Sequence, residues 1–254
     1  MLSCKVTDAI NLSGNFMARR CWANPLGGCG SLSREHVVSR SVIASVCGCP
    51  LVVSGFPILP AGRIGINSLT ANILCREHNS ALSVLDSVAA TLIAFLRKAR
   101  DPGPHQVELD GELLERWLLK TMINVLVAGW ADGRRWSPDG RLVEAIFGKR
   151  EIPAELGMSM VERISQARGD DGVSLTFLWA GAGESERVPI GAHFCVEGLT
   201  LFMPLHAHAL AAARRDCGSG VHLESHLHRP ALIRVDRNKG EAMLARLRWG
   251  VLRS

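Results

Sequence analysis

Tyrosine is absent from this sequence, and aromatic residues make up only 5% of its 254 residues. So few aromatic side chains argue against a base-stacking surface of the kind that many RNA-binding proteins use. The chain shows no internal repeat, and 47% of its residues are hydrophobic. The composition therefore excludes a disordered or collagen-like chain and predicts a globular protein of one large domain or two small ones.

Long hydrophobic runs are also missing. The longest run, residues 88–96, includes a threonine and is far shorter than the roughly twenty residues that a membrane-spanning helix needs. The first residues of the sequence lack the apolar core of a signal peptide. We therefore expect a soluble, cytoplasmic protein that does not bind a membrane.

Positive charge is only slightly in excess, because 29 Lys and Arg residues face 24 Asp and Glu residues, giving a net charge of +5. This surplus is compatible with an anionic partner such as nucleic acid but does not require one. Cysteine, by contrast, is concentrated. In a reducing compartment cysteines serve as thiols or metal ligands rather than as disulfides. Six of the eight fall within the first 75 residues: Cys4, Cys21, Cys29, Cys47, Cys49 and Cys75.

The sequence pattern predicts an α+β chain in three parts. Residues 1–100 begin with short β-prone runs separated by Gly, Pro, Ser and Asn, and they end in a helix that starts at Asn79. Residues 101–140 read as a helical connector, with a helix over 111–127. Residues 141–254 read as a smaller α+β domain whose role in recognition, dimerisation or partner docking stays open.

Within the last part, residues 153–167 read as a helix, and residues 172–179, 193–204 and 231–235 read as strands. Gly198 divides the second of these strands into a predicted hairpin.

A zinc site is predicted in the first part. Cys75 and His78 form a C-x-x-H pair, a spacing that lets two ligands from one tight turn reach the same ion. Cys21 and Cys29 are the natural second pair, because two glycines form a flexible turn before Cys29. Cys4 is a possible substitute for Cys21, and the motif Cys47-Gly48-Cys49 could compete for the ion. A structural zinc contributes about 10–16 kcal/mol in small zinc-binding units, enough to hold a loop-rich segment together.

Glu35 and His36 follow Cys29, and Asn79 directly follows His78. With these residues in this order, residues 20–90 resemble the HNH (ββα-metal) endonuclease family. The resemblance implies a zinc-stapled ββα-metal nuclease module within residues 1–100. It also implies metal-dependent hydrolysis of DNA phosphodiester bonds.

The resemblance assigns His36 as the general base, and Glu35 and Asn79 as ligands of a catalytic Mg²⁺ or Mn²⁺. Asn72 corresponds to the middle asparagine of the family pattern, with Asn67 as the alternative. We also expect the helix that begins at Asn79 to direct its N-terminal amides toward bound phosphate.

Arginines surround the motif, and Arg34, Arg40 and Arg76 are candidate contacts to a nucleic-acid backbone. The expected partners are DNA and either a second copy of the chain or a partner protein of an antiviral defence system, in which the nuclease would act as a restriction-type or anti-phage effector. Two other readings stay open. One is a non-catalytic zinc-stapled DNA-binding module. The other is a hydrolase of small substrates built on the C-terminal histidines His206, His208, His222, His226 and His228.

Overall fold

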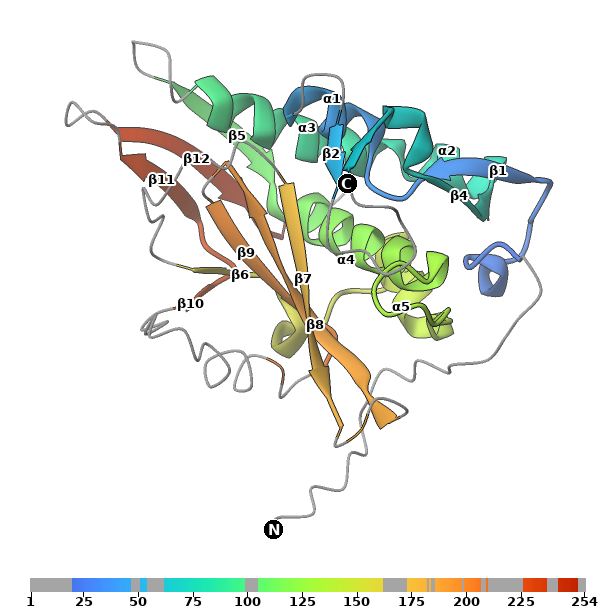
Figure 1. Cartoon of the computed structure of the whole chain (residues 1–254). Helices are drawn as coiled ribbons and strands as arrows, with labels where there is room; N and C mark the ends of the chain where they lie inside the picture. Colours follow the sequence, from blue (N-terminus) through green and yellow to red (C-terminus); the bar gives the residue numbers. More distant parts are fainter. Residues whose placement is uncertain are drawn as a thin grey trace.

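The structure is a computed structural model, shown in Figure 1. It describes residues 20–46, 51–53, 62–98, 105–161, 173–181, 183, 186–197, 199–206, 209, 226–236 and 242–250. Within these ranges the chain combines helices with several β-sheets, which confirms the predicted α+β class.

The N-terminal elements are arranged around a two-stranded antiparallel sheet made by β1 and β4. In this sheet Leu32 lies opposite Cys75, and His36 lies opposite Thr70. Strands β2 and β3 form a second antiparallel pair. The elements of this region are η1 (Asn24–Leu26), β1 (Leu32–His36), α1 (Arg40–Val46), β2 (Leu51–Val53), β3 (Gly62–Ile64), η2 (Ile66–Ser68), β4 (Thr70–Cys75), α2 (Arg76–Ala81) and α3 (Ser83–Lys98).

Helix α4 (Gly111–Ala128) crosses the middle of the molecule, as Figure 1 shows. It packs against α3 and β4 on one side and against β9 of the larger sheet on the other. The sequence dictates both of its ends. The Asp110 side chain accepts a hydrogen bond from the Leu113 N–H at 3.0 Å, and Gly129 adopts a left-handed conformation with φ +75°. The helix predicted over 111–127 is therefore confirmed almost residue for residue.

The C-terminal elements form two further sheets. One is a five-stranded sheet in the order β10-β6-β9-β8-β7, and the other is a three-stranded sheet in the order β11-β12-β5. The predicted hairpin is confirmed, since Phe194 of β8 lies opposite Leu201 of β9. The elements are β5 (Gln106–Asp110), α5 (Gly140–Ile146), η3 (Ala154–Leu156), β6 (Ser159–Val161), β7 (Val173–Ala180), β8 (Val188–Val196), β9 (Leu199–Pro204), β10 (His226–His228), β11 (Leu232–Asp236) and β12 (Ala242–Arg248).

Two sequence predictions of local structure are wrong. Residues 153–161 do not form the predicted α-helix. They contain only the short 3-10 helix η3 and then β6, which pairs with β9 on one side and with β10 on the other, and this long-range pairing outweighs the local pattern. Residues 162–167 of the predicted helix lie outside the described residues. The helix that carries Asn79 begins at Arg76, because Cys75 ends β4 in an extended conformation and serves as the N-cap.

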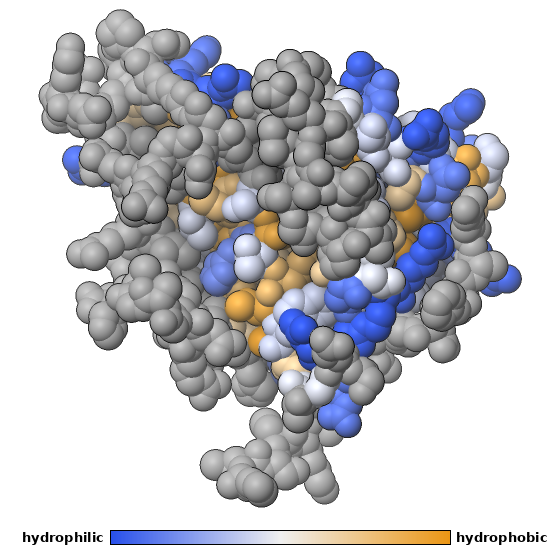
Figure 2. Space-filling view, in the orientation of Figure 1, coloured by the Kyte–Doolittle hydropathy of each residue, from blue (hydrophilic) through white to orange (hydrophobic). Residues whose placement is uncertain are grey.

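One main cluster of buried apolar side chains extends from Cys21 to Leu247, so the N-terminal elements, α4 and the C-terminal sheets share a core. In the face drawn in Figure 2, hydrophobic residues gather near the middle and hydrophilic residues lie toward the edge. No helix of the described residues combines the length and the apolar character that crossing a membrane requires.

Candidate metal centre

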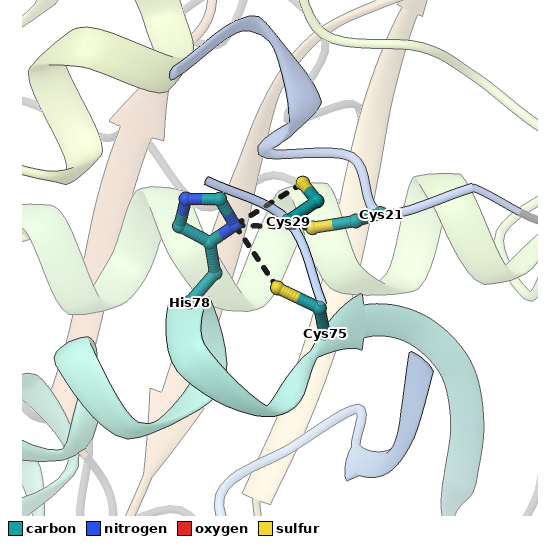
Figure 3. Close-up of side chains that lie close together, drawn as sticks. All are labelled: Cys21, Cys29, Cys75 and His78. Carbon is teal, nitrogen blue, oxygen red and sulfur yellow. Dashed lines mark hydrogen bonds between the residues drawn. The ribbon is translucent and has the colours of Figure 1, made fainter. Parts of the chain in front are cut away.

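Three cysteines and one histidine converge beside the β1–β4 sheet. Their ligand atoms all lie within 4.8 Å of one another. The His78 Nδ1 atom is 3.4 Å from the Cys21 Sγ, 3.5 Å from the Cys29 Sγ and 3.2 Å from the Cys75 Sγ, and Figure 3 shows the three sulfurs turned toward the ring. These are the four residues that the spacing predicted. Cys4, Cys47 and Cys49 lie outside the described residues.

The sequence brings these four side chains together through two short structures. Gly27 and Gly28 have φ values of +74° and +66°, a conformation that favours glycine and turns the chain so that Cys29 comes back toward Cys21. On the other side, Cys75 is the last residue of β4 and His78 lies in the first turn of α2. The two halves are joined by a 2.9 Å hydrogen bond from the Trp22 N–H to the Ile73 carbonyl.

Burial sets the electrostatics of this cluster. It raises the pKa of the Cys21 thiol to about 12 and is also the main cause that raises the pKa of Cys29. Burial lowers the pKa of His78, which favours the neutral imidazole that binds metals. Without a cation the buried Cys21 therefore keeps its proton, and a bound cation would favour the thiolate. Three thiols and one imidazole can hold a metal such as zinc.

Groups outside the cluster hold its ligands in place. The Glu77 carboxylate accepts a 3.2 Å hydrogen bond from the N–H of Gly30, the residue after Cys29. The His78 ring meets the Phe147 ring edge-on, with ring centroids 5.3 Å apart, and Phe147 also contacts Trp22. The turn after α5 therefore covers the cluster and ties it to the centre of the chain.

Glu35 lies at the second candidate site, on β1. It is only 4% exposed, its carboxylate lies 3.3 Å from the Lys120 ammonium, and the Asn79 side chain lies close enough to lower its pKa. Burial raises the pKa of Glu35, and the adjacent Lys120 ammonium opposes that rise. The structure thus brings Glu35 and Asn79 together, as the family resemblance implies.

His36 is the next residue of β1. Its Nε2 atom is buried and has no hydrogen-bond partner among the described residues. Burial is the largest cause that lowers the pKa of His36, and the positive charges of Arg40 and Arg34 lower it further. The lowered pKa favours the neutral imidazole, and no hydrogen bond at the buried Nε2 atom within the described residues fixes which ring nitrogen carries the proton.

The remaining predicted residues lie at the surface. Arg34, Arg40 and Arg76 are exposed, and the first two flank His36 in sequence. Asn72 is exposed on β4, and within the described part of the chain its side chain makes no hydrogen bond. The predicted phosphate site at a helix beginning with Asn79 is not present, because Asn79 lies inside α2 rather than at its first residue.

Sequence reasoning missed a polar stripe on α4. The Trp117 Nε1–H donates to the Ser39 Oγ at 2.9 Å, and Lys120 contacts Glu35. Asn124 accepts from the Trp22 Nε1–H at 3.0 Å. The signal was present in the sequence, because these three α4 residues are spaced three and four apart, which places them on one face of the helix.

The other metal predictions receive no such support. Among the described residues, the Cys21–Cys29–Cys75–His78 cluster is the one group of at least three His, Cys, Asp or Glu side chains that could hold a metal. His226 and His228 lie on β10, and His208 and His222 lie outside the described residues.

No family model, no curated protein and no solved structure matches this chain. The function therefore has to be argued from the residues of the site and from their geometry.

Proposed function

We propose that this protein is a metal-dependent HNH endonuclease that hydrolyses DNA phosphodiester bonds. The position of His36 carries the proposal. It lies beside Glu35 on β1, its Nε2 has no hydrogen-bond partner among the described residues, and Asn79 reaches Glu35 from α2. The antiparallel pair β1–β4, in which β4 leads directly into α2, supports the ββα module that the resemblance implies, with α1, β2 and β3 inserted between the two strands.

Zinc is the proposed occupant of the cysteine–histidine cluster, in a structural role. A closed set of four sulfur and nitrogen ligands leaves no position for substrate, which is typical of structural rather than catalytic zinc. The cluster includes Cys75, the residue that joins β4 to α2. A zinc ion there would fix the start of α2, and with it Asn79, relative to β1.

His36 would serve as the general base that takes a proton from the attacking water. A neutral imidazole with a free ring nitrogen is suited to this task near neutral pH. The Glu35 carboxylate and the Asn79 amide offer the hard oxygen donors that Mg²⁺ and Mn²⁺ prefer, so these residues fit a divalent ion and would hold it. Such an ion supplies positive charge for the phosphate and for the leaving oxygen. Arg34, Arg40 and Arg76 would bind the phosphate backbone.

One observation favours a second candidate, a non-catalytic zinc-stapled DNA-binding module. The buried Glu35 carboxylate is already paired with Lys120, as in a purely structural ion pair. DNA is the proposed partner of both candidates. For the nuclease, pairing with a second copy of the chain or with a partner protein would decide whether one or both DNA strands are cut.

Nicking of supercoiled plasmid tests the proposal. Zinc-loaded protein, freed of other divalent ions, is incubated with plasmid with or without Mn²⁺ or Mg²⁺. Wild type should convert the plasmid to open-circular DNA only with the added ion, and His36→Ala should not. His105→Ala is the matched control, because His105 also has a buried Nε2 without a partner among the described residues but lies next to β5.

The result separates the two candidates. Loss of nicking in His36→Ala with unchanged DNA affinity supports the nuclease. DNA binding by wild type without nicking under any ion would instead support the binding module.

A further inference from the structure

Lys120 is a fully buried ammonium that bridges two carboxylates. Its side chain is 1% exposed, and its Nζ atom lies 2.9 and 3.0 Å from the two Asp86 oxygens and 3.3 Å from the Glu35 Oε1. The Glu35 and Asp86 side chains are themselves only 5% and 23% exposed. The two acids come from separate elements, β1 and α3, so the ammonium joins three elements at one point.

The surroundings of Lys120 leave it little freedom to move. Asp86 also accepts a hydrogen bond from the Ser39 hydroxyl, and Ser39 accepts one from the Trp117 indole. Trp117, Lys120 and Asn124 form the polar stripe of α4, and Asn124 donates to the Val37 carbonyl at 3.3 Å. The stripe therefore contacts both the strand that carries Glu35 and His36 and the turn that follows it.

We propose that Lys120 is a positioning residue of the candidate catalytic centre. Its ammonium lies between Glu35 and Asp86 and takes the place that a divalent ion would otherwise occupy there. Its role in catalysis rests on the proposed function, whereas its role as a cation between the two acids rests on the contacts alone. A buried carboxylate and a partly buried one that share one site need a positive charge, and Lys120 supplies it. Asp86 is thereby kept from the catalytic ion, and Glu35 is held in one orientation beside Asn79.

The variant Lys120→Met keeps an unbranched side chain that is one atom shorter and removes its charge. In a buffer without divalent ions other than the bound zinc, we expect its Tm to fall by roughly 10 °C, because the buried Glu35 and the partly buried Asp86 lose their shared partner. Mn²⁺ should then restore at least half of that loss and should stabilise wild type much less. The double variant Lys120→Met/Asp86→Asn should lose this response to Mn²⁺, since one of the two acids is gone.

Arg116→Met is the matched control. Arg116 lies on the same helix and is also largely buried, but its ion-pair partner is Glu112 rather than either acid of the centre. We expect Arg116→Met to lower the Tm without any added response to Mn²⁺. If Lys120→Met is unfolded in metal-free buffer, refolding from urea with and without MnCl₂ gives the same comparison. Refolding that requires Mn²⁺ supports the proposal, and failure under both conditions overturns it.

Plasmid nicking then tests the positioning role. We expect Lys120→Met to nick roughly 100-fold more slowly than wild type even at Mn²⁺ concentrations that restore its Tm, because Glu35 is no longer held in place. Wild-type nicking by a Mn²⁺-stabilised Lys120→Met would overturn that role. If wild type does not nick at all, the proposed function fails. The recovery of the Lys120→Met Tm on addition of Mn²⁺ still decides whether Lys120 acts as the internal cation.

Discussion

At the scale of single residues, the cysteine–histidine cluster combines ligands of different burial. Cys75 and Cys21 are buried, whereas Cys29 is exposed at the end of its glycine turn. Water cannot take the place of the buried cysteines as a metal ligand, whereas it can reach the position of the exposed Cys29 more easily. The buried position at the junction of β4 and α2 is therefore the one at which a ligand change should cost the most.

Cys75→Ser tests this expectation. A serine hydroxyl is a poor zinc ligand, and we expect the purified variant to contain less than half of the zinc of wild type and to have a lower Tm. Cys195→Ser is the control, because Cys195 is a partly exposed free cysteine on β8, away from the cluster. Metal analysis of both variants decides the question, and full zinc occupancy in Cys75→Ser would contradict the four-ligand site.

Residue patterns predicted the cluster but not its surroundings. Cys75 and His78 are close in sequence, so their spacing alone indicates a shared ion. Lys120 lies far from Glu35 along the chain, and only the packing of α4 against α3 and against β4, the partner strand of β1, brings their charges together. The family resemblance likewise supplied Glu35, His36 and Asn79 but not Asp86, whose role depends on Lys120.

At the scale of elements, α4 connects the two candidate sites with the C-terminal sheet. Its Glu115 is 1% exposed and accepts a 2.6 Å hydrogen bond from the Met158 N–H and two from the Arg229 guanidinium, at 3.0 and 3.1 Å. Arg229 also donates to the Ile152 carbonyl at 2.9 Å. A single carboxylate therefore fixes the segment before β6 and the turn after β10 against the central helix.

Glu115→Gln removes this charge at almost constant volume. We expect the free energy of unfolding to fall by about 2 kcal/mol, within the range for a hydrogen bond to a charged group. The loss is not larger because the Arg229 side chain is 29% exposed and therefore partly solvated. Glu144→Gln removes the same charge from an exposed pair with Arg150 and should cost less than about 1 kcal/mol. Urea unfolding of the two variants measures the difference, and equal losses would contradict the assigned role of Glu115.

The elements that were predicted correctly are those whose ends are determined by residues close by in the sequence. Helix α4 begins after a capping Asp110 and ends at Gly129, and the paired strands β8 and β9 lie next to each other in sequence, so short-range signals are sufficient. Strand β5 is different, because it pairs in parallel with β12, more than a hundred residues away. No local pattern specifies such a partner, and the same is true of β6, which is a strand only because β9 and β10 flank it.

At the scale of the whole molecule, the shared core links the cluster to the distant sheets. The main cluster of buried apolar residues contains Trp22 and Cys75 beside the candidate metal site, and it also contains Phe194 of β8. Trp117 of α4 touches Phe194 with ring centroids 6.0 Å apart and donates to Ser39 beside β1. Destabilisation of the N-terminal elements should therefore also destabilise the five-stranded sheet, because α4 contacts both.

Removal of zinc tests this coupling. A metal that binds only the folded state adds its binding free energy to stability, so chelation should lower the free energy of unfolding by several kcal/mol. We expect the metal-free protein to lose hydrogen-exchange protection in the β8–β9 hairpin as well as in β1 and β4, and added Zn²⁺ but not Mg²⁺ to restore it. The shared core predicts this joint response, because α4 packs against both β4 and β9 and cannot detach from β4 without exposing the side chains that it packs against β9. Retention of full protection in β8–β9 after β1 and β4 have opened would show instead that the two regions unfold independently.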